Sequence, residues 1–160
     1  MLDDLDAVPW ASLAQPEWNA PDAVPRALRR LAGAGSERES EAAYTAYLFA
    51  VGNDHAGTYY PVVLATLPFL GAVLERGGEW AKRTALAALI DLTASFEPEP
   101  GHESAEAPGG GPSGLAAQLA AGAARLSDAV HAVAADTALA ERTRAAATEL
   151  LTHLAPAGPG

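Results

Sequence analysis

The residues of this 160-residue sequence that could most readily do chemistry lie in one short polar segment, residues 53–60. His55 directly follows Asp54, and a carboxylate next to an imidazole can orient a general base or a ligand-contacting histidine. Thr58 and Tyr60 add two hydroxyl groups to the same segment. If these side chains converge, the segment would form a small-ligand pocket or an active site.

The same segment also has a purely structural interpretation, which we favour. Gly52 and Gly57 flank its first half, and glycine supplies the backbone angles that a tight turn between helices needs. Turn residues with several side-chain donors and acceptors commonly cap helix ends, so His55 and Thr58 would satisfy free amides and carbonyls. We therefore expect capping rather than catalysis, with His55 as the best single candidate for a functional residue.

A second candidate, Trp80, lies in the first turn of a helix that we expect over residues 79–96. Tryptophan is enriched at the energetically dominant positions of protein interfaces, so an exposed Trp80 would be an interface anchor. We expect Lys82, Arg83 and Asp91 of the same helix to face the solvent. The sequence leaves open whether Trp80 is exposed or packed.

Glu97 and Glu99 begin the segment 97–112, which is rich in proline, glycine and glutamate. Such a composition buries little apolar surface, so we expect a flexible loop. Residues 1–22 hold five acidic side chains and no basic one, and residues 97–106 hold four and no basic one. These two segments carry most of the formal net charge of −10, and any charge-driven contact with a partner should map to them.

The net charge also narrows the classes of partner. A chain with 20 acidic and 10 basic residues is repelled by nucleic-acid phosphates and anionic membranes, so we expect neither as a partner. A basic protein is the partner that this charge would attract. The apolar runs are too short to span a bilayer, and the acidic N-terminus does not resemble a secretory signal, so we expect a cytoplasmic protein.

The sequence contains no recognised catalytic or metal-binding motif. It has no cysteine, no GxSxG motif and no HExxH pair, which removes thiolate chemistry, a serine-hydrolase elbow and the common zinc sites. No two of its four histidines are three or four residues apart, as two ligands on one helix face would be. We therefore predict no catalytic residue, no cofactor and no metal, and a chain that is not an enzyme.

The elements that would position the candidate residues are helices. Alanine, the strongest helix former, is the commonest residue, and strand-favouring runs are missing. Leucine-rich stripes, a capping box over Ser36–Glu39 and glycine stops set the helix boundaries. The resulting single domain comprises an irregular acidic leader (1–21), two helix pairs (22–96), the flexible acidic loop (97–112), a third helix pair (113–155) and a disordered tail (156–160).

The three helix pairs open near residues 22, 60 and 114, and the third consists of helices over 113–135 and 137–154. Helix pairs repeated at roughly 40-residue spacing are typical of HEAT or armadillo-type α-solenoids. The fold class that we expect is all-α, a short HEAT-like α-solenoid of three antiparallel helix pairs. A six-helix bundle is the alternative, and periodicity alone does not separate the two.

One stretch of the sequence resembles a known group. Residues 54–61 read DHAGTYYP, and LPFL follows at 67–70. In small actinobacterial HEAT-repeat proteins a His-x-Gly-Thr-x-Tyr segment similarly leads into a helix that contains Val-Pro-Phe-Leu. The resemblance covers about residues 2–103. It implies an α-solenoid with a binding surface, in a group whose roles are mostly unassigned, and it carries over no catalytic residue.

Together these observations favour a non-enzymatic protein–protein interaction module of undetermined oligomeric state. Its most concrete form is an immunity or antitoxin-type protein, because some small bacterial HEAT-like domains resemble immunity partners of polymorphic toxins. An acidic surface suits a basic toxin-like partner. The alternative is a small-ligand-binding protein or an enzyme with a pocket near residues 53–60. The candidate binding residues are Asp54, His55, Thr58, Tyr60, Trp80, Glu97 and Glu99.

Overall fold

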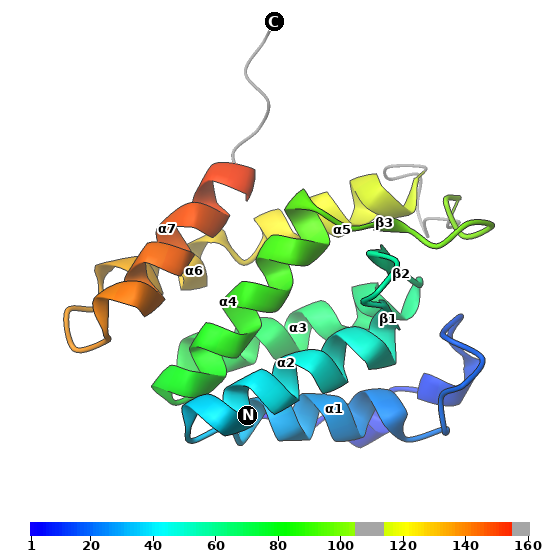
Figure 1. Ribbon diagram of the computed structural model, residues 1–160, viewed down its shortest axis with the longest axis horizontal. Helices are drawn as coiled ribbons and strands as arrows, with labels where there is room; N and C mark the ends of the chain where they lie inside the picture. The colour runs from blue at the N-terminus through cyan, green and yellow to red at the C-terminus, as the bar shows by residue number, and fades with distance from the viewer. Residues whose placement is uncertain (105–113, 155–160) are drawn as a thin grey trace, which may run out of the picture.

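The computed structural model of this chain describes residues 1–104 and 114–154. In these residues the protein is mostly helical, as predicted, with seven α-helices, two short 3-10 helices and one small sheet (Figure 1). The α-helices are α1 (Ala23–Ala32), α2 (Glu37–Val51), α3 (Val62–Arg76), α4 (Glu79–Ala94), α5 (Leu115–Ala124), α6 (Ser127–Ala135) and α7 (Glu141–Leu154). The 3-10 helices are η1 (Leu5–Ala7) and η2 (Trp10–Ser12), and the strands are β1 (Gly52–Asn53), β2 (Thr58–Tyr59) and β3 (Glu97–Pro98).

The predicted capping box begins α2. The Ser36 hydroxyl accepts a hydrogen bond from the Glu39 amide at 3.3 Å, as expected for an N-cap serine. The Glu39 carboxylate accepts from the Gly35 amide at 2.8 Å, one residue before the amide that the capping box predicts. Both contacts fix the turn between α1 and α2, and so they set where α2 starts.

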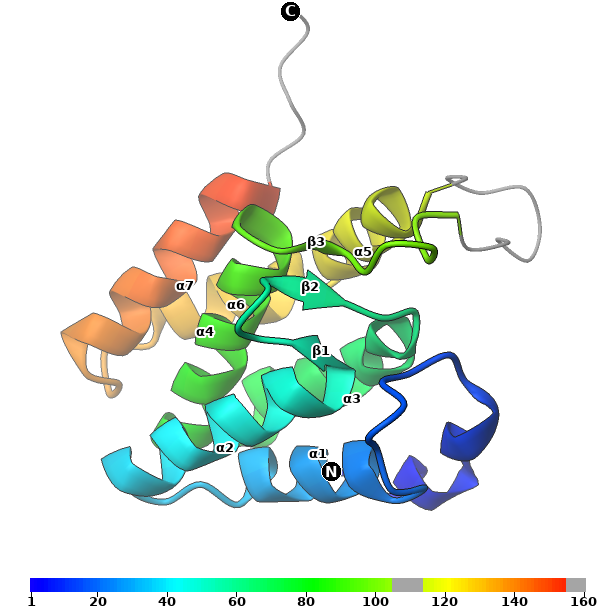
Figure 2. The same ribbon diagram turned by 45° about the vertical axis from the view of Figure 1, so that its right-hand side comes forward.

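Two layers of helices form the body of the molecule. α2, α4 and α7 lie side by side in one layer, while α1, α3, α5 and α6 form the other (Figure 1, Figure 2). α3 packs against α4 between the first and last helix pairs, and it is the most buried helix in the described residues. Its apolar side chains include Val62, Val63, Leu67, Leu70, Val73 and Leu74, each buried.

A small sheet of three two-residue strands is the one departure of the described residues from the all-α prediction, which is otherwise met by their mostly helical structure. β1 and β2 form an antiparallel hairpin after α2, in which Gly52 pairs with Tyr59. β3 then joins β2 in parallel, with Thr58 opposite Glu97 (Figure 2). Gly57, in the turn of the hairpin, has a φ of +69°, as expected for a glycine that permits a tight turn. Strands of two residues show no alternating pattern, so the sequence did not reveal them.

The prediction of a flexible loop over residues 97–112 is wrong for its first residues. The amides of Glu97 and Glu99 donate to the carbonyls of Gly57 and Tyr59 at 2.9 and 2.8 Å, which pairs this segment with the hairpin. Proline lacks an amide hydrogen, but Pro98 lies between the two donating residues and leaves the pairing intact. The rest of that loop from residue 105, and the predicted tail, lie outside the described residues.

The third helix pair differs from the prediction because its first helix is broken. In place of one helix over 113–135, α5 ends at Ala124 and α6 begins at Ser127, whose hydroxyl donates to the Ala124 carbonyl at 2.5 Å. Leu126, at the break, packs so closely on α3 that a Cβ at Gly71 would lie 2.9 Å from its methyl group. The described residues therefore contain seven helices rather than the predicted six.

The acidic leader is folded onto the helices rather than irregular throughout. Leu5 and Trp10, in the two 3-10 helices, are buried, and the Trp10 indole donates to the Leu5 carbonyl at 2.7 Å. The Trp10 ring also packs against Phe69 of α3, with ring centroids 5.9 Å apart. Leu5 and Trp10 are consequently part of the core, and they fasten the N-terminal segment to the helices.

Ion pairs neutralise part of the leader's charge. Asp6 accepts from Arg29 of α1 at 2.5 Å, and Asp22 pairs with Arg26 at 3.2 Å. The Asp3 carboxylate lies 3.1 Å from the N-terminal amine. Three of the five carboxylates of residues 1–22 are thus paired within the chain, and this segment offers a partner less unpaired charge than its composition suggests.

Among the helices of residues 1–104 and 114–154, none combines the length and the apolar character that crossing a membrane requires.

Candidate functional site

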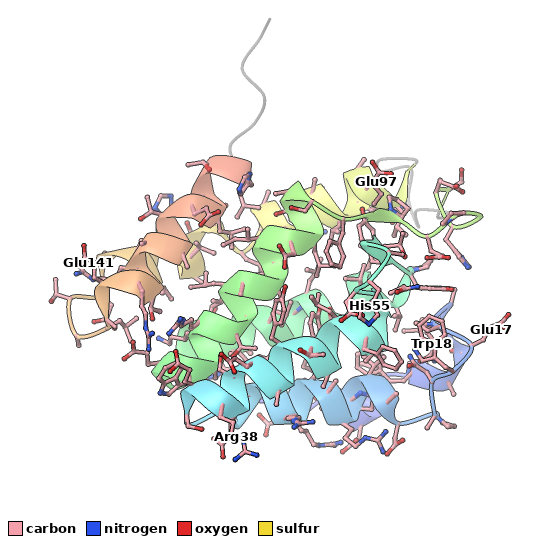
Figure 3. All side chains as sticks on the ribbon, viewed as in Figure 1. Glu17, Trp18, Arg38, His55, Glu97 and Glu141 are labelled. Atoms are coloured by element: carbon pink, nitrogen blue, oxygen red, sulfur yellow. The ribbon has the colours of Figure 1, made fainter. Side chains whose placement is uncertain are left out.

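Most of the candidate residues from the hairpin lie together, but their side chains are occupied by contacts within the chain rather than directed at a ligand. The Thr58 hydroxyl donates to the Glu99 carboxylate and so fastens β2 to the segment that follows β3. The Tyr60 ring packs against the His102 imidazole, with ring centroids 4.9 Å apart. Glu97 is exposed at the outer side of the sheet (Figure 3). These contacts hold the sheet together. Among these four candidates, Glu97 is the one whose side chain is exposed and could meet a partner.

Asp54 and His55 are not arranged as a catalytic pair. His55 is exposed, and no hydrogen bond joins it to Asp54 in the described residues (Figure 3). The Asp54 Oδ1 atom is shielded from solvent and has no hydrogen-bond partner there. The side-chain cap of this turn is Asn53, whose Oδ1 accepts from the Ala56 amide at 3.2 Å. A general base oriented by Asp54 therefore has no support in the geometry.

A groove between the N-terminal halves of α2 and α4 lies at the other end of α4 from this sheet. It has a volume of about 360 Å³ and is open to solvent. Its walls are formed by Glu37, Ser40, Glu41, Tyr44 and Thr45 of α2 and by Trp80, Arg83, Thr84 and Ala87 of α4. We call this feature the α2–α4 groove, and it contains Trp80, the remaining candidate from the sequence.

Trp80 lies where α2, α4 and α7 meet. Two guanidinium groups approach its indole, that of Arg83 at 5.1 Å from the ring centre and that of Arg142 of α7 at 4.9 Å. Arg142 also pairs with Glu37 of α2 at 3.3 Å. A cation near the face of an indole is attracted by the ring quadrupole, so these contacts hold the half-buried ring in place. The result is a pre-positioned aromatic side chain in the wall of an open groove.

Arg83 lines the groove without an internal counterion. Its Nη1 atom is shielded from solvent and has no acceptor in the described residues, where no ion pair includes this side chain. By contrast, Arg26, Arg29, Arg76 and Arg142 each reach a carboxylate within 3.3 Å. Because shielded polar groups are normally paired, Arg83 is the group of the groove best prepared to receive an acceptor from outside the chain.

Two hydroxyl groups at the base of the groove satisfy each other. The Thr84 hydroxyl donates to the Trp80 carbonyl at 2.7 Å, and the Ser40 hydroxyl lies 2.7 Å from the Thr84 oxygen. Since a hydroxyl has one proton and that of Thr84 is used, Ser40 donates to Thr84. Both side chains are buried, so this bond ties α2 to α4 beneath the groove and gives it a fixed floor.

Tyr44 marks the far end of the groove. Its hydroxyl donates to the Asp91 carboxylate. Burial raises the pKa of Tyr44 well above its usual value, and the negative charges of Asp91 and Asp54 raise that pKa further. Tyr44 therefore keeps its proton at neutral pH and serves as a hydrogen-bond donor to Asp91, which also accounts for the half-buried position of Asp91.

A second hollow, separate from the groove, lies between the leader, α1 and α2. It has a volume of about 440 Å³, and Trp18 and Phe49 stack at its edge with ring centroids 5.3 Å apart. Both rings are about half exposed, at 48% and 49%. We call this feature the Trp18 shelf. In the part of the chain that the structure describes, no cluster of three or more histidine and carboxylate side chains could hold a metal ion.

Sequence reasoning missed Arg83 as a member of the site. We predicted that Lys82, Arg83 and Asp91 face the solvent, whereas all three are half-buried. The reason is that α2 and α7 lie on either side of α4, which a helix periodicity does not reveal. A usable signal was the spacing of Trp80 and Arg83, because residues three apart lie on the same face of a helix.

Comparison with protein-family models, curated proteins and solved structures finds no match to this chain. The resemblance to small actinobacterial HEAT-repeat proteins therefore stays a prediction, and the function has to be argued from the geometry alone.

Proposed function

We propose that this chain is a non-enzymatic protein-binding module that holds a segment of its partner in the α2–α4 groove. The observation that carries this proposal is Trp80, half-buried in the groove wall beside the guanidinium groups of Arg83 and Arg142. Tryptophan and arginine in a partly desolvated pocket are the residues that most often dominate the binding energy of protein interfaces.

The stacking of the helix pairs supports a short HEAT-like solenoid as the architecture of this module. The pair α1–α2 packs on α3–α4, and α3–α4 packs on the third pair, in which α5 and α6 together oppose α7. In a solenoid such stacking creates an extended face from equivalent helices of successive repeats. Here α2, α4 and α7 would form that face, and the α2–α4 groove runs between its first two helices.

The arrangement of the hairpin favours binding over the alternative of an enzyme or a small-ligand protein with a pocket near residues 53–60. Thr58 and Tyr60 contact Glu99 and His102, and His55 is exposed without a hydrogen bond to Asp54. An active site instead holds its acid and base within hydrogen-bond reach of a bound substrate. The groove around Trp80 is the better candidate for the binding site.

Peptide selection tests the proposal directly. A library of short random peptides displayed on phage should yield binders to the folded protein, and Trp80→Ala should weaken the best of them by about 30-fold or more, as expected for a hot-spot tryptophan. Affinities would be measured by isothermal titration calorimetry. Because truncation of a half-buried ring could disturb the fold, Thr45→Tyr provides a second variant that fills the groove from an exposed position.

Trp18→Ala is the matched control, because it removes an exposed tryptophan outside the groove. We expect this variant to bind the selected peptides as the unchanged protein does. If the selected peptides bind the unchanged protein, Trp80→Ala and Thr45→Tyr with equal affinity, the proposal is contradicted. A selection that enriches no peptide would also contradict it.

The immunity or antitoxin-type form of the proposal adds a basic, toxin-like partner. It is supported by the net charge of −10 and by the exposed Glu97 at the sheet. Opposite net charges speed association and make its rate depend on salt. With a natural basic protein whose sequence contains the motif of the selected peptides, we expect the association rate constant to fall about tenfold or more as salt is raised. A rate constant independent of ionic strength in stopped-flow experiments would exclude this form.

A further inference from the structure

The shielded guanidinium of Arg83 indicates the chemistry of the segment that the groove binds. We propose that this segment carries a carboxylate, from an aspartate or glutamate side chain, that pairs with Arg83 next to an apolar group packed on Trp80. This inference rests on the proposed binding function and specifies its ligand. It begins from the one cation in the groove wall that forms no ion pair in the described residues.

The environment of Arg83 makes an external carboxylate favourable. A charged group that is shielded from water without a hydrogen-bond partner is destabilising, since it has lost part of its hydration and gained no acceptor in return. The Nη1 atom of Arg83 is in this condition and is itself closed to a ligand atom, whereas the side chain as a whole is partly exposed and lines the groove. A carboxylate would therefore meet the guanidinium from the side that faces the groove. A carboxylate supplies two acceptors in the plane of the guanidinium, and such pairs are among the strongest hydrogen bonds in proteins.

The carboxylates already in the groove region do not fill this role. Glu37 pairs with Arg142 at 3.3 Å, and Glu79 accepts from the Ala140 amide at 3.2 Å and from the Thr143 hydroxyl at 3.1 Å. Glu41 lines the groove but is exposed, so water solvates its charge. A ligand therefore gains more from compensating the shielded Arg83 than from meeting the solvated Glu41.

The position of Trp80 adds a second requirement. Trp80 and Arg83 are three residues apart on one face of α4, and the guanidinium lies 5.1 Å from the indole centre. A segment whose carboxylate reaches Arg83 consequently places its neighbouring side chain against the indole. An apolar neighbour would bury surface there, so the expected ligand is an acidic residue next to an apolar one.

Two peptide libraries that differ at one position test this chemistry. The libraries are identical except that the fixed central residue is glutamate in one and glutamine in the other. We expect binders from the glutamate library, and changing that residue to glutamine in the best peptide should weaken binding by about tenfold or more. Arg83→Gln should cause a similar loss, and combining it with the glutamine peptide should cause little additional loss, because the two changes remove the same contact.

Three further variants make the result decisive. Arg38→Gln removes an arginine of α2 outside the groove (Figure 3) and should leave binding of the glutamate peptide unchanged. Arg83→Lys keeps the positive charge but lacks the planar guanidinium, so it should retain part of the binding affinity. Glu41→Gln should leave binding of the glutamate peptide unchanged or strengthen it. A loss of binding in Glu41→Gln would mean that the groove recognises a cation, and would overturn the inference.

The failure of this inference can be told from the failure of the proposed function. If Trp80→Ala abolishes binding while Arg83→Gln and the glutamine peptide do not weaken it, the groove binds a partner without reading a carboxylate. If none of these changes weakens binding, the proposed function fails as well. Far-UV circular dichroism and the urea midpoint of each variant establish that it is folded before its affinity is compared.

Discussion

Replacing Gly52 by alanine should lower the free energy of unfolding by about 3 kcal/mol, because the added methyl group has no room. A Cβ at this position would lie 2.0 Å from the Thr58 carbonyl oxygen and 2.9 Å from the Tyr59 Cα. Both neighbours are backbone atoms of β2, so no side chain can move aside and the hairpin must open. The φ of Gly52 is −170°, an extended value open to any residue, which leaves the close approach as the cause.

Gly78→Ala is the matched control for this substitution. Gly78 is the N-cap of α4, has a φ of −68°, and would bring its Cβ within 4 Å of no other group. We expect a loss below about 1 kcal/mol, which reflects the weaker capping by alanine. Urea unfolding followed by circular dichroism compares the two variants with the unchanged protein. Equal losses, or a Gly52→Ala variant as stable as the parent, would show that β1 and β2 are not packed as described.

Raising the pH above about 10 should destabilise the protein steeply. Burial raises the pKa of Tyr59 from 10.0 to about 12, with a smaller contribution from the charge of Glu97. Burial also raises the pKa of the fully buried Tyr47 well above its usual value, against an opposing hydrogen bond with Thr66. In the folded state these tyrosines hold protons that the unfolded chain releases near pH 10.

The sign of the effect follows from proton linkage. The stability from a raised tyrosine pKa is fully present below the unfolded value of 10.0, and for Tyr59 it is lost as the pH rises toward about 12. In that window each such tyrosine lowers the free energy of unfolding by up to about 1.4 kcal/mol per pH unit. Urea titrations at a series of alkaline pH values measure this slope.

Tyr47→Phe is the variant that tests the assignment of this slope. It removes one titrating group, so its stability should fall less steeply with pH than that of the unchanged protein, although its stability at neutral pH is lower. That neutral-pH loss should be about 1 kcal/mol, because the Tyr47 hydroxyl lies 2.7 Å from Thr66 in a buried hydrogen bond. Identical slopes for the two proteins would mean that Tyr47 does not retain its proton as described.

The local parts of the fold could be predicted from the sequence because they depend on neighbouring residues. The Ser36 cap and the glycine stops predicted where the early helices begin and end. The apolar residues on all sides of α3 are likewise a local pattern that indicates burial. The turn at Gly57 was predicted as well, because a turn of this kind requires a positive φ at one position and glycine adopts that angle without strain.

The parts that were not predicted depend on contacts between distant residues. β3 exists because the amides of Glu97 and Glu99 meet the hairpin across about 40 positions of sequence, and proline-rich composition argued against a strand there. The break between α5 and α6 coincides with the contact of Leu126 and Gly71, two residues from different helix pairs. Neither contact leaves a trace in local periodicity.

The candidate site was predicted in part. Four of the candidate residues do lie near one another: Thr58, Tyr60, Glu97 and Glu99. However, the Thr58 hydroxyl donates to the Glu99 carboxylate, and this contact stabilises the sheet. Trp80 lies in the groove that supports the proposed function, whereas its neighbour Arg83 was expected in solvent. The local sequence predicts that an arginine on a helix faces solvent. The shielding of Arg83 comes from the helices packed beside α4, and local sequence does not reveal those neighbours.

The most direct test of the groove as the binding site uses the three tryptophans of this chain, Trp10, Trp18 and Trp80, whose indole N–H groups give separate signals in an NMR correlation spectrum. The buried Trp10 indole donates a hydrogen bond to the Leu5 carbonyl, and the Trp18 indole, at the Trp18 shelf, donates one to the Phe49 carbonyl. On titration with the best peptide from the glutamate library, we expect the Trp80 signal to shift to saturation while the other two stay in place. A shift of the Trp18 signal with the Trp80 signal unmoved would contradict binding in the α2–α4 groove.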